Sequence, residues 1–284
     1  MSAAADRRAQ WRDLVARRLP EAARPGWPVH LDHCFARILL DNACGGPWRD
    51  SVAPPAHANM PADDLEHAID LGEAVLDGRA DLALLNRRSL AWRGKIATAP
   101  VPEGLRDGDL LLRRWRPDDT APFAALNADP MVMEFFPRLR TETESAVEAV
   151  RCDRRFVADG FGPWAVERDG RFVGFVGAFR IMQAMPFPGG ERIGATIELG
   201  WRLARDAWGH GIATRAARLT LADLAGRCGL RTVVAYTASG NDRSRAVMER
   251  LGMAPSGTFP HPAVPDGPLR THRLYRLDPV EVSA

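Results

Sequence analysis

Residues 198–214 read ELGWRLARDAWGHGIAT, and this stretch sets the architecture of the second half of the chain. We expect a strand over Thr196–Leu203, a short loop that holds Gly209 and Gly211, and a helix over Ala213–Cys228. Glycines let a backbone approach a ligand closely, and the helix N-terminus offers unpaired N–H groups at the positive end of the helix dipole. The arrangement therefore predicts a cradle for a phosphate or diphosphate.

The loop fits neither of two common phosphate-binding motifs. It is not a P-loop, because no Lys-Ser or Lys-Thr pair follows the glycines. Gly209 and Gly211 match the first two glycines of the dinucleotide motif G-x-G-x-x-G, but Thr214 stands where the third should be. Two glycines alone equally fit a tight turn that binds no ligand. A second motif is needed to indicate which ligand the loop binds.

That second motif is the stretch NDRSRAVMERLGM at residues 241–253, which follows an expected strand over Arg231–Ala238 and contains an expected helix over Ser244–Leu251. The order of strand, glycine loop, helix, strand and Asn-x-x-Ser helix resembles the GCN5-related N-acetyltransferases, the GNAT family. The Trp-Gly-x-Gly-x-Ala-Thr loop and the tail FPHPAVPDGPLRTHRLYRL look like the subgroup of ribosomal-protein alanine N-acetyltransferases. The resemblance covers about residues 105–280 and does not extend to residues 1–95.

The resemblance implies a mixed α/β (α+β) fold, with a mostly antiparallel sheet whose two central strands splay apart and whose faces are flanked by helices. Acetyl-CoA is then expected to lie in the gap as co-substrate, its pantetheine arm pairing with the backbone like an added strand. The positions that match the coenzyme-binding residues of the family are Trp201, Leu203, Gly209, His210, Gly211, Ala213, Thr214, Asn241 and Ser244.

Several of these residues also have ordinary structural explanations. The side chains of Trp201 and Leu203 fit a core, and Asn241 is a favourable N-cap for the helix that follows it. The structural and the coenzyme-binding roles are compatible.

The implied chemistry is direct attack of a neutral amine on a thioester in a ternary complex. A base must take a proton from the amine, and a backbone N–H must stabilise the oxyanion. Glu198 is the candidate base, directly or through water, unless it is merely a solvated or salt-bridged carboxylate. Many relatives place a tyrosine seven positions after the motif Asn, but this chain has Met248 there. Either Ser244 serves as the leaving-group acid or no dedicated acid is needed.

Three further polar residues lie near the expected cleft. His261 and His272 occupy the tail that flanks the acceptor site in the family, although a structural polar contact is the commoner role of a lone histidine. Arg205 stands where relatives often have proline, and we expect it to be exposed near the coenzyme phosphates.

The rest of the second half alternates helices and strands, with Asp169-Gly170 as the turn of a hairpin. The expected strands are Leu110–Trp115, Pro163–Arg168, Arg171–Arg180 and Leu269–Leu277, and the expected helices are Pro117–Asp129 and Glu142–Ala158.

The first 95 residues predict a small all-helical domain. Apolar residues recur at helical spacing in four segments, while residues 51–61 (SVAPPAHANMP) read as a loop. Residues 94–109 lack periodicity, which places a linker at 96–104 between domains at 1–95 and 105–284. The four expected helices are Asp6–Leu19, Leu31–Ala43, Asp63–Leu76 and Ala80–Trp92.

A metal site in this domain is not expected, although His30, His33, Cys34 and Cys44 are potential ligands. His33 and Cys34 are adjacent and would point about 100° apart on a helix. Together with Asp32, Asp41 and Asn42, His33 makes its helix unusually polar, so this helix could face a partner or the other domain.

Composition narrows the class of protein. The chain has 284 residues, 46% apolar and 26% charged, which is typical of a globular protein. No apolar run or N-terminal signal predicts membrane insertion or secretion. The net charge of +2 does not favour nucleic-acid binding. Cys34, Cys44, Cys152 and Cys228 form no CxxC pair, so we expect reduced thiols and a cytoplasmic protein.

The sequence thus predicts an acetyl-CoA-dependent N-acetyltransferase without a metal. The expected acceptor is a primary amine, either a protein N-terminus or a small molecule. A homodimer is a possible assembly. The alternative is a non-catalytic acyl-CoA-binding or sensing module with a helical partner-binding domain. Residues 1–95 could shape the acceptor pocket, bind a partner or only stabilise the chain.

Overall fold

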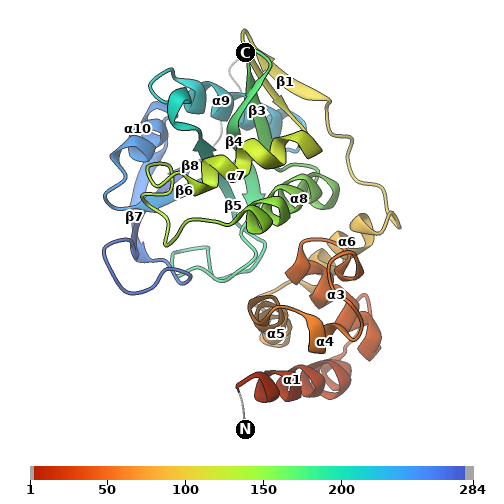
Figure 1. Ribbon diagram of the computed structural model, residues 1–284. Helices are drawn as coiled ribbons and strands as arrows, with labels where there is room; N and C mark the ends of the chain where they lie inside the picture. Colours follow the sequence, from red (N-terminus) through yellow and green to blue (C-terminus); the bar gives the residue numbers. More distant parts are fainter. Residues whose placement is uncertain (1–2, 279–284) are drawn as a thin grey trace.

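The computed structural model describes residues 3–278, and its first part is a group of helices around an apolar core (Figure 1). The periodic apolar residues point inward, and Leu14, Leu39 and Leu71 have no exposed surface. We call residues 3–95 the helical unit. Its helices are α1 (Ala3–Asp13), the π-helical turn Leu14–Arg18, α2 (Leu19–Ala22), α3 (Asp32–Cys44), the 3-10 turn Trp48–Asp50, α4 (Ala56–Asn59), α5 (Ala62–Leu76) and α6 (Leu82–Trp92).

The four predicted helices are present, with two corrections. The first helical run continues to Ala22, because Pro20, which comes just after the π-helical turn Leu14–Arg18, lies inside the run and does not end it. The expected loop at residues 51–61 contains the short helix α4, whose single turn is too brief to give a periodic pattern. The predicted stop after Ala43 is confirmed, because Gly45 caps α3 with a left-handed φ of 65°.

From the sequence, the polar residues of α3 could face a partner or the other domain, but Asp41 and Asn42 face α6 of the same unit. Asp41 has no exposed surface and accepts hydrogen bonds from Ser89 Oγ at 2.6 Å and from Arg93 Nε at 2.7 Å. Asn42 is buried and donates to the carbonyl oxygen of Leu85 at 2.9 Å. These side chains tie α3 to α6 inside the helical unit.

The second part is a sheet of eight strands in the order β1-β2-β3-β4-β5-β6-β8-β7. Every neighbouring pair is antiparallel except β5 and β6, which run parallel. The strands are β1 (Gly104–Asp107), β2 (Leu110–Arg113), β3 (Pro163–Arg168), β4 (Arg171–Arg180), β5 (Ile197–Leu203), β6 (Val233–Ala238), β7 (Ala254–Pro260) and β8 (Thr271–Leu277). The helices are α7 (Thr120–Ala128), α8 (Glu142–Asp159), α9 (Ile212–Gly226) and α10 (Asp242–Arg250), with 3-10 turns at Pro117–Asp119 and Arg205–Ala207.

The mixed, mostly antiparallel sheet confirms the predicted fold class, but two edge strands were missed. β1 begins at the last residue of the predicted linker and pairs only with β2. β7 reads APSGTFP, and all but one of its residues are exposed. Its sequence therefore lacks the alternation of apolar and polar residues that predicts a strand. Its pairing with β8 holds it in the sheet instead.

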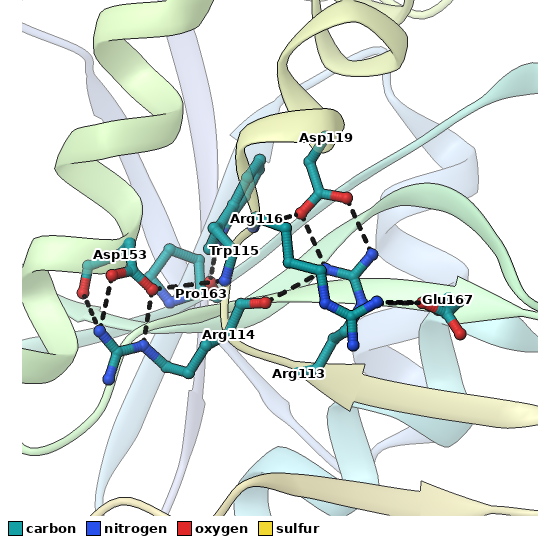
Figure 2. Close-up of polar contacts among 8 residues, drawn as sticks. All are labelled: Arg113, Arg114, Trp115, Arg116, Asp119, Asp153, Pro163 and Glu167. Atoms are coloured by element: carbon teal, nitrogen blue, oxygen red, sulfur yellow. Dashed lines mark hydrogen bonds and ion pairs between the residues drawn. The ribbon is translucent and has the colours of Figure 1, made fainter.

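Charged side chains anchor the first strands of the sheet to the helices (Figure 2). Buried Arg113 of β2 donates to both carboxylate oxygens of Asp119 at 2.8 Å and to Glu167 of β3 at 2.7 Å. These hydrogen bonds raise the pKa of the Arg113 guanidinium, so it stays charged. The next residue, Arg114, pairs with Asp153 of α8 at 2.6 Å. The network fixes β2, β3 and α8 relative to one another.

We call residues 104–278, which hold the sheet and its helices, the sheet domain. The helical unit packs on the sheet domain below α8 (Figure 1). Trp92 Nε1 donates to the carbonyl oxygen of Arg154 at 2.8 Å, and buried Arg88 lies 3.5 Å from the carboxylate of Asp159. Within residues 3–278, no helix is both long and apolar enough to cross a membrane.

The buried position of Asp41 yields a prediction about stability. Asp41→Ala leaves the Arg93 guanidinium and Ser89 without their acceptor, so we expect the free energy of unfolding to fall by about 2–4 kcal/mol. Glu66→Ala removes an exposed carboxylate of the same unit that lies 3.8 Å from Arg7, and it should change stability by less than about 0.5 kcal/mol. Urea denaturation followed by circular dichroism measures both, and equal effects would contradict the role of Asp41.

Candidate active site

The site begins where β5 and β6 part. β5 pairs with β4 along its whole length, but with β6 it forms a single ladder pair, Glu198 with Val234. A cleft of about 1290 Å³ opens from this point and is lined by both strands, by the loop at Gly209 and by α10. Backbone N–H and C=O groups beyond Glu198 therefore have room to pair with an extended ligand.

The loop before α9 has the open backbone expected of an anion cradle. Gly209 and Gly211 have φ values of 79° and 71°, which glycine adopts without strain, and no atom lies within 4 Å of where a Cβ would be. Gly211 is the N-cap of α9 and provides no side chain to satisfy the first N–H groups of the helix. Both glycines, with Ala213 and Thr214 of the first turn of α9, line the cleft, which fits a coenzyme diphosphate.

The remaining residues of the loop differ in their positions. His210 is exposed and is absent from the residues that line the cleft. Arg205 is exposed as predicted, but it does not line the cleft either. Arg243 of α10 also lines the cleft, and its guanidinium carbon lies 4.3 Å from the ring centroid of Trp208, the residue before Gly209. Sequence reasoning missed Arg243, because only the fold brings α10 against this loop.

Trp201 and Leu203 of β5 line the cleft and also pack on the main apolar core. Leu203 is buried, whereas Trp201 is partly exposed. The core packing anticipated for these side chains is thus present, and the same two residues lie beyond the point where β6 diverges from β5.

Asn241 and Ser244 line the opposite wall of the cleft. Asn241 is the N-cap of α10, and its Oδ1 accepts a hydrogen bond from the Ser244 N–H at 3.1 Å. Its Nδ2 donates to Thr237 Oγ1 at 2.9 Å, which ties the cap to β6. Met248, one turn further along, is buried in the core and lines the bottom of this wall.

Glu198 lies at the fork of the two strands, partly buried, and it is neither fully solvated nor salt-bridged within the described chain. Its Oε2 accepts a hydrogen bond from the Tyr236 hydroxyl at 2.6 Å. Burial raises the pKa of the Glu198 carboxyl to about 7, while the Tyr236 hydrogen bond and the charge of Arg155 act in the opposite direction. A carboxyl with this pKa exchanges protons readily near neutral pH, as a general base must.

Tyr236 was not predicted, because its place in a strand gives no sign of its partner. Val234 is the residue of β6 that pairs with Glu198. Residues two apart on a strand face the same side of the sheet, so the side chain of Tyr236 lies on the same side as that of Val234. Burial, together with the nearby Glu198 charge, raises the pKa of the Tyr236 hydroxyl, so it remains a hydrogen-bond donor.

The two histidines of the tail meet beside Tyr236. The ring centroids of His261 and His272 are 4.8 Å apart, and they lie 5.6 and 5.9 Å from the Tyr236 ring. Both line the cleft. Burial lowers the pKa of both imidazoles, that of His261 to about 4, so they are neutral at physiological pH. Together with Phe259 they form an uncharged cluster of rings around Tyr236.

No group of three or more potential metal-ligating side chains gathers anywhere in residues 3–278. His33 is exposed, whereas Cys44 is buried. The four cysteines are free thiols, and burial raises the pKa of Cys44 to about 11 and of Cys152 to about 12.

Comparison with known proteins identifies the family of the chain. Residues 109–254 match the family described as Acetyltransferase (GNAT) domain, which spans more than half of the chain. The chain therefore belongs to the GNAT acetyltransferase family, and it is an N-acetyltransferase. The match begins after the helical unit, so the family assignment concerns the sheet domain.

Solved structures share the fold at low sequence identity. RimL, a ribosomal L7/L12 alpha-N-protein acetyltransferase, matches with a TM-score of 0.51 and 14% identity, covering 62% of this chain and 94% of its own. RimL in complex with coenzyme A matches with the same TM-score and identity, covering 64% and 100%. A GNAT-family acetyltransferase from Bacillus anthracis has 21% identity, a TM-score of 0.49 and coverages of 62% and 98%.

The raised pKa of Glu198 predicts a pH dependence of stability. An unfolded glutamate ionises near 4.5, but in the folded protein the value is about 7, so the folded state binds the proton more tightly. Stability should therefore fall as pH rises from 4.5 to about 7. Glu198→Gln removes this loss and should be more stable than the parent at pH 8, by about 1–3 kcal/mol.

Denaturant titrations at several pH values measure this difference. Glu103→Gln, which neutralises an exposed glutamate, is the matched control and should follow the pH dependence of the parent. A constant difference between Glu198→Gln and the parent at all pH values would show that the carboxyl does not titrate as described.

Proposed function

We propose that this N-acetyltransferase uses acetyl-CoA and transfers the acetyl group to a primary amine in a ternary complex, with Glu198 as the base. The observation that carries the proposal is the position of Glu198. Its carboxyl, with a pKa of about 7, lies at the one ladder pair between β5 and β6, where the coenzyme-sized cleft begins. When bound there, acetyl-CoA supplies the activated acetyl group.

The residues proposed to hold the coenzyme follow the cleft from end to end. The N–H groups around Gly209, Gly211, Ala213 and Thr214 suit the diphosphate, because they cluster at the N-terminus of α9. Along β5, the backbone of Trp201 and Leu203 suits the amides of the pantetheine arm. Asn241 and Ser244 contact the arm from the α10 side. His210 takes part only through its backbone, since its side chain is exposed.

Glu198 would take the proton that a primary amine must lose. A carboxylate accepts this proton directly or through one water, and its raised pKa makes the transfer favourable near neutral pH. Tyr236 holds the carboxylate oxygen at 2.6 Å and so orients the base. The neutral imidazoles of His261 and His272 add no positive charge that would repel the amine.

For the leaving thiol, the chain offers Ser244 and not the tyrosine common in the family. The Ser244 side chain lines the cleft, while Met248 occupies the tyrosine position and cannot donate a proton. We propose that Ser244 hydrogen-bonds the thiol sulfur, or that water protonates it.

The acceptor is proposed to be a protein N-terminus or a small-molecule amine. RimL, whose fold is similar, is named as an alpha-N-protein acetyltransferase of ribosomal L7/L12, which supports the first choice. A cytoplasmic location, a homodimer and the division into domains at residues 1–95 and 105–284 stay predictions.

The cradle is tested by adding a methyl group where the diphosphate should lie. Gly209→Ala should weaken acetyl-CoA binding by about tenfold, because the new Cβ enters open space beside the N–H groups. Gly78→Ala in the helical unit has the same φ of 79° and equally open surroundings, so it carries the same backbone strain away from the cleft. Isothermal titration calorimetry should give an unchanged Kd for Gly78→Ala, and equal losses in both variants would refute the assignment.

The catalytic assignment predicts a separation of binding from turnover. Glu198→Gln should lower kcat by about 100-fold or more at pH 7.5, because a neutral amide cannot accept the proton, while the Kd for acetyl-CoA stays unchanged. Ser244→Ala should have a smaller effect on kcat, since water can replace the hydroxyl.

Release of free thiol with a panel of peptide N-termini and small amines measures this turnover. Glu103→Gln is the control and should match the parent. Coenzyme binding without turnover by the parent protein on every amine would favour the non-catalytic sensing module instead.

A further inference from the structure

The helical unit meets the sheet domain through a segment that also reaches the active site. No described residue of the unit lines the cleft, so it does not shape the pocket directly. It contacts instead the stretch between β4 and β5, residues 181–196, which we call the connecting segment.

One side of the connecting segment is built into the helical unit. Ile193 is buried among the apolar core residues of the unit, and its N–H donates to the carbonyl oxygen of Arg79 at 2.9 Å. Ile193 also forms a parallel bridge with Ala80. A Cβ on Gly194 would lie 2.6 Å from Leu84 Cδ2 of α6, so the backbone of the segment is in direct contact with the helix.

The other side of the segment packs around Tyr236. Ile181, Met185 and Phe187 form an apolar cluster with Val234 and Phe259, and Tyr236 packs against this cluster. The Phe187 ring centroid is 6.3 Å from that of Tyr236 and 5.0 Å from that of Phe259.

Hydrogen bonds within the segment join its two sides. The Gly194 N–H donates to the Ile181 carbonyl oxygen at 2.8 Å, and Arg180 Nη1 donates to the carbonyl oxygen of Gly194 at 2.8 Å. Thr196 Oγ1 donates to the carbonyl oxygen of Gly189 at 2.7 Å. A displacement at Ile193 is therefore transmitted across the segment rather than absorbed by a loose loop.

We propose that the helical unit is a positioning element of the acyl-transfer site. By burying Ile193 it fixes the connecting segment, and through Phe187 the segment fixes the Tyr236 hydroxyl against the Glu198 carboxylate. Ile193 and Phe187 are positioning residues that act through Tyr236. The inference rests on the proposed function, in which Glu198 is the base.

The hydrogen bond from Tyr236 is the contact of Glu198 that a shift of the connecting segment should change. Tyr236 gives Glu198 a hydrogen bond from β6 and Arg155 of α8 exerts a weaker charge effect, while His261 and His272 pack against the Tyr236 ring. A looser Tyr236 hydrogen bond removes an interaction that favours the carboxylate, so the pKa of Glu198 should rise.

The experiment compares Ile193→Ala with Arg192→Ala in the full chain. Arg192 is the exposed neighbour on the same segment, so its variant controls for a general effect of mutation there. For Ile193→Ala we expect the Glu198 titration, followed by carbon-13 NMR of the carboxyl, to move to higher pH. We expect kcat to fall by about tenfold and the KM for acetyl-CoA to stay unchanged. Arg192→Ala should match the parent in the Glu198 titration, in kcat and in the KM for acetyl-CoA.

Two further variants separate positioning from stability. Ile193→Val keeps most of the buried volume and should shift the Glu198 titration in the same direction by less, even if Ile193→Ala folds poorly. In a Tyr236→Phe background, which has already lost the hydrogen bond, Ile193→Ala should no longer move the titration.

The inference is overturned if Ile193→Ala and Ile193→Val both titrate like Arg192→Ala, or if the shift persists undiminished in the Tyr236→Phe background. A fall in kcat that only follows the folded fraction also overturns it. The NMR titration needs no acceptor amine, so a failure of the proposed acyl transfer is seen separately, as an absence of turnover by the parent.

Discussion

The limited pairing of β5 with β6 is the constraint on which the rest of the molecule depends. A sheet gains stability by pairing every backbone N–H and C=O, yet here the two central strands share only the pair of Glu198 and Val234. The full ladders on either side, β4 with β5 and β6 with β8, hold the strands while they diverge. In the proposed function, the unpaired backbone is a binding surface, because an extended ligand would complete the ladder.

The fork also explains the unusual carboxyl. Glu198 lies where the strands are still close, and burial raises the pKa of its carboxyl to about 7. The same enclosure strengthens its hydrogen bond to Tyr236, which keeps a titrating group in one orientation. The orientation of the Glu198 carboxyl and its raised pKa thus have the same cause, which is the narrowing of the cleft at the single ladder pair of β5 and β6.

The helical unit belongs to this picture although the family match leaves it out. Its core is completed by Ile193, a residue of the sheet domain, and polar contacts such as Trp92 with Arg154 join the unit to α8. The connecting segment shares its apolar residues between this core and the cluster around Tyr236. The two parts of the chain therefore pack as neighbours with a common element, which a linker alone would not provide.

Local patterns in the sequence predicted most helices and strands and the glycine loop at Gly209 and Gly211, because caps, turns and periodicity depend on neighbouring residues, whereas Glu198 was singled out only through the family resemblance. They missed β1 and β7, whose places in the sheet come from pairing with β2 and β8, and they gave no sign that Asp41 and Asn42 of α3 are buried against α6. They gave no sign that Tyr236 and Arg243 lie at the cleft, and only the family resemblance placed His261 and His272 there. Those contacts join residues distant in the chain, and the packing of β6, β8 and α10 against one another fixes them.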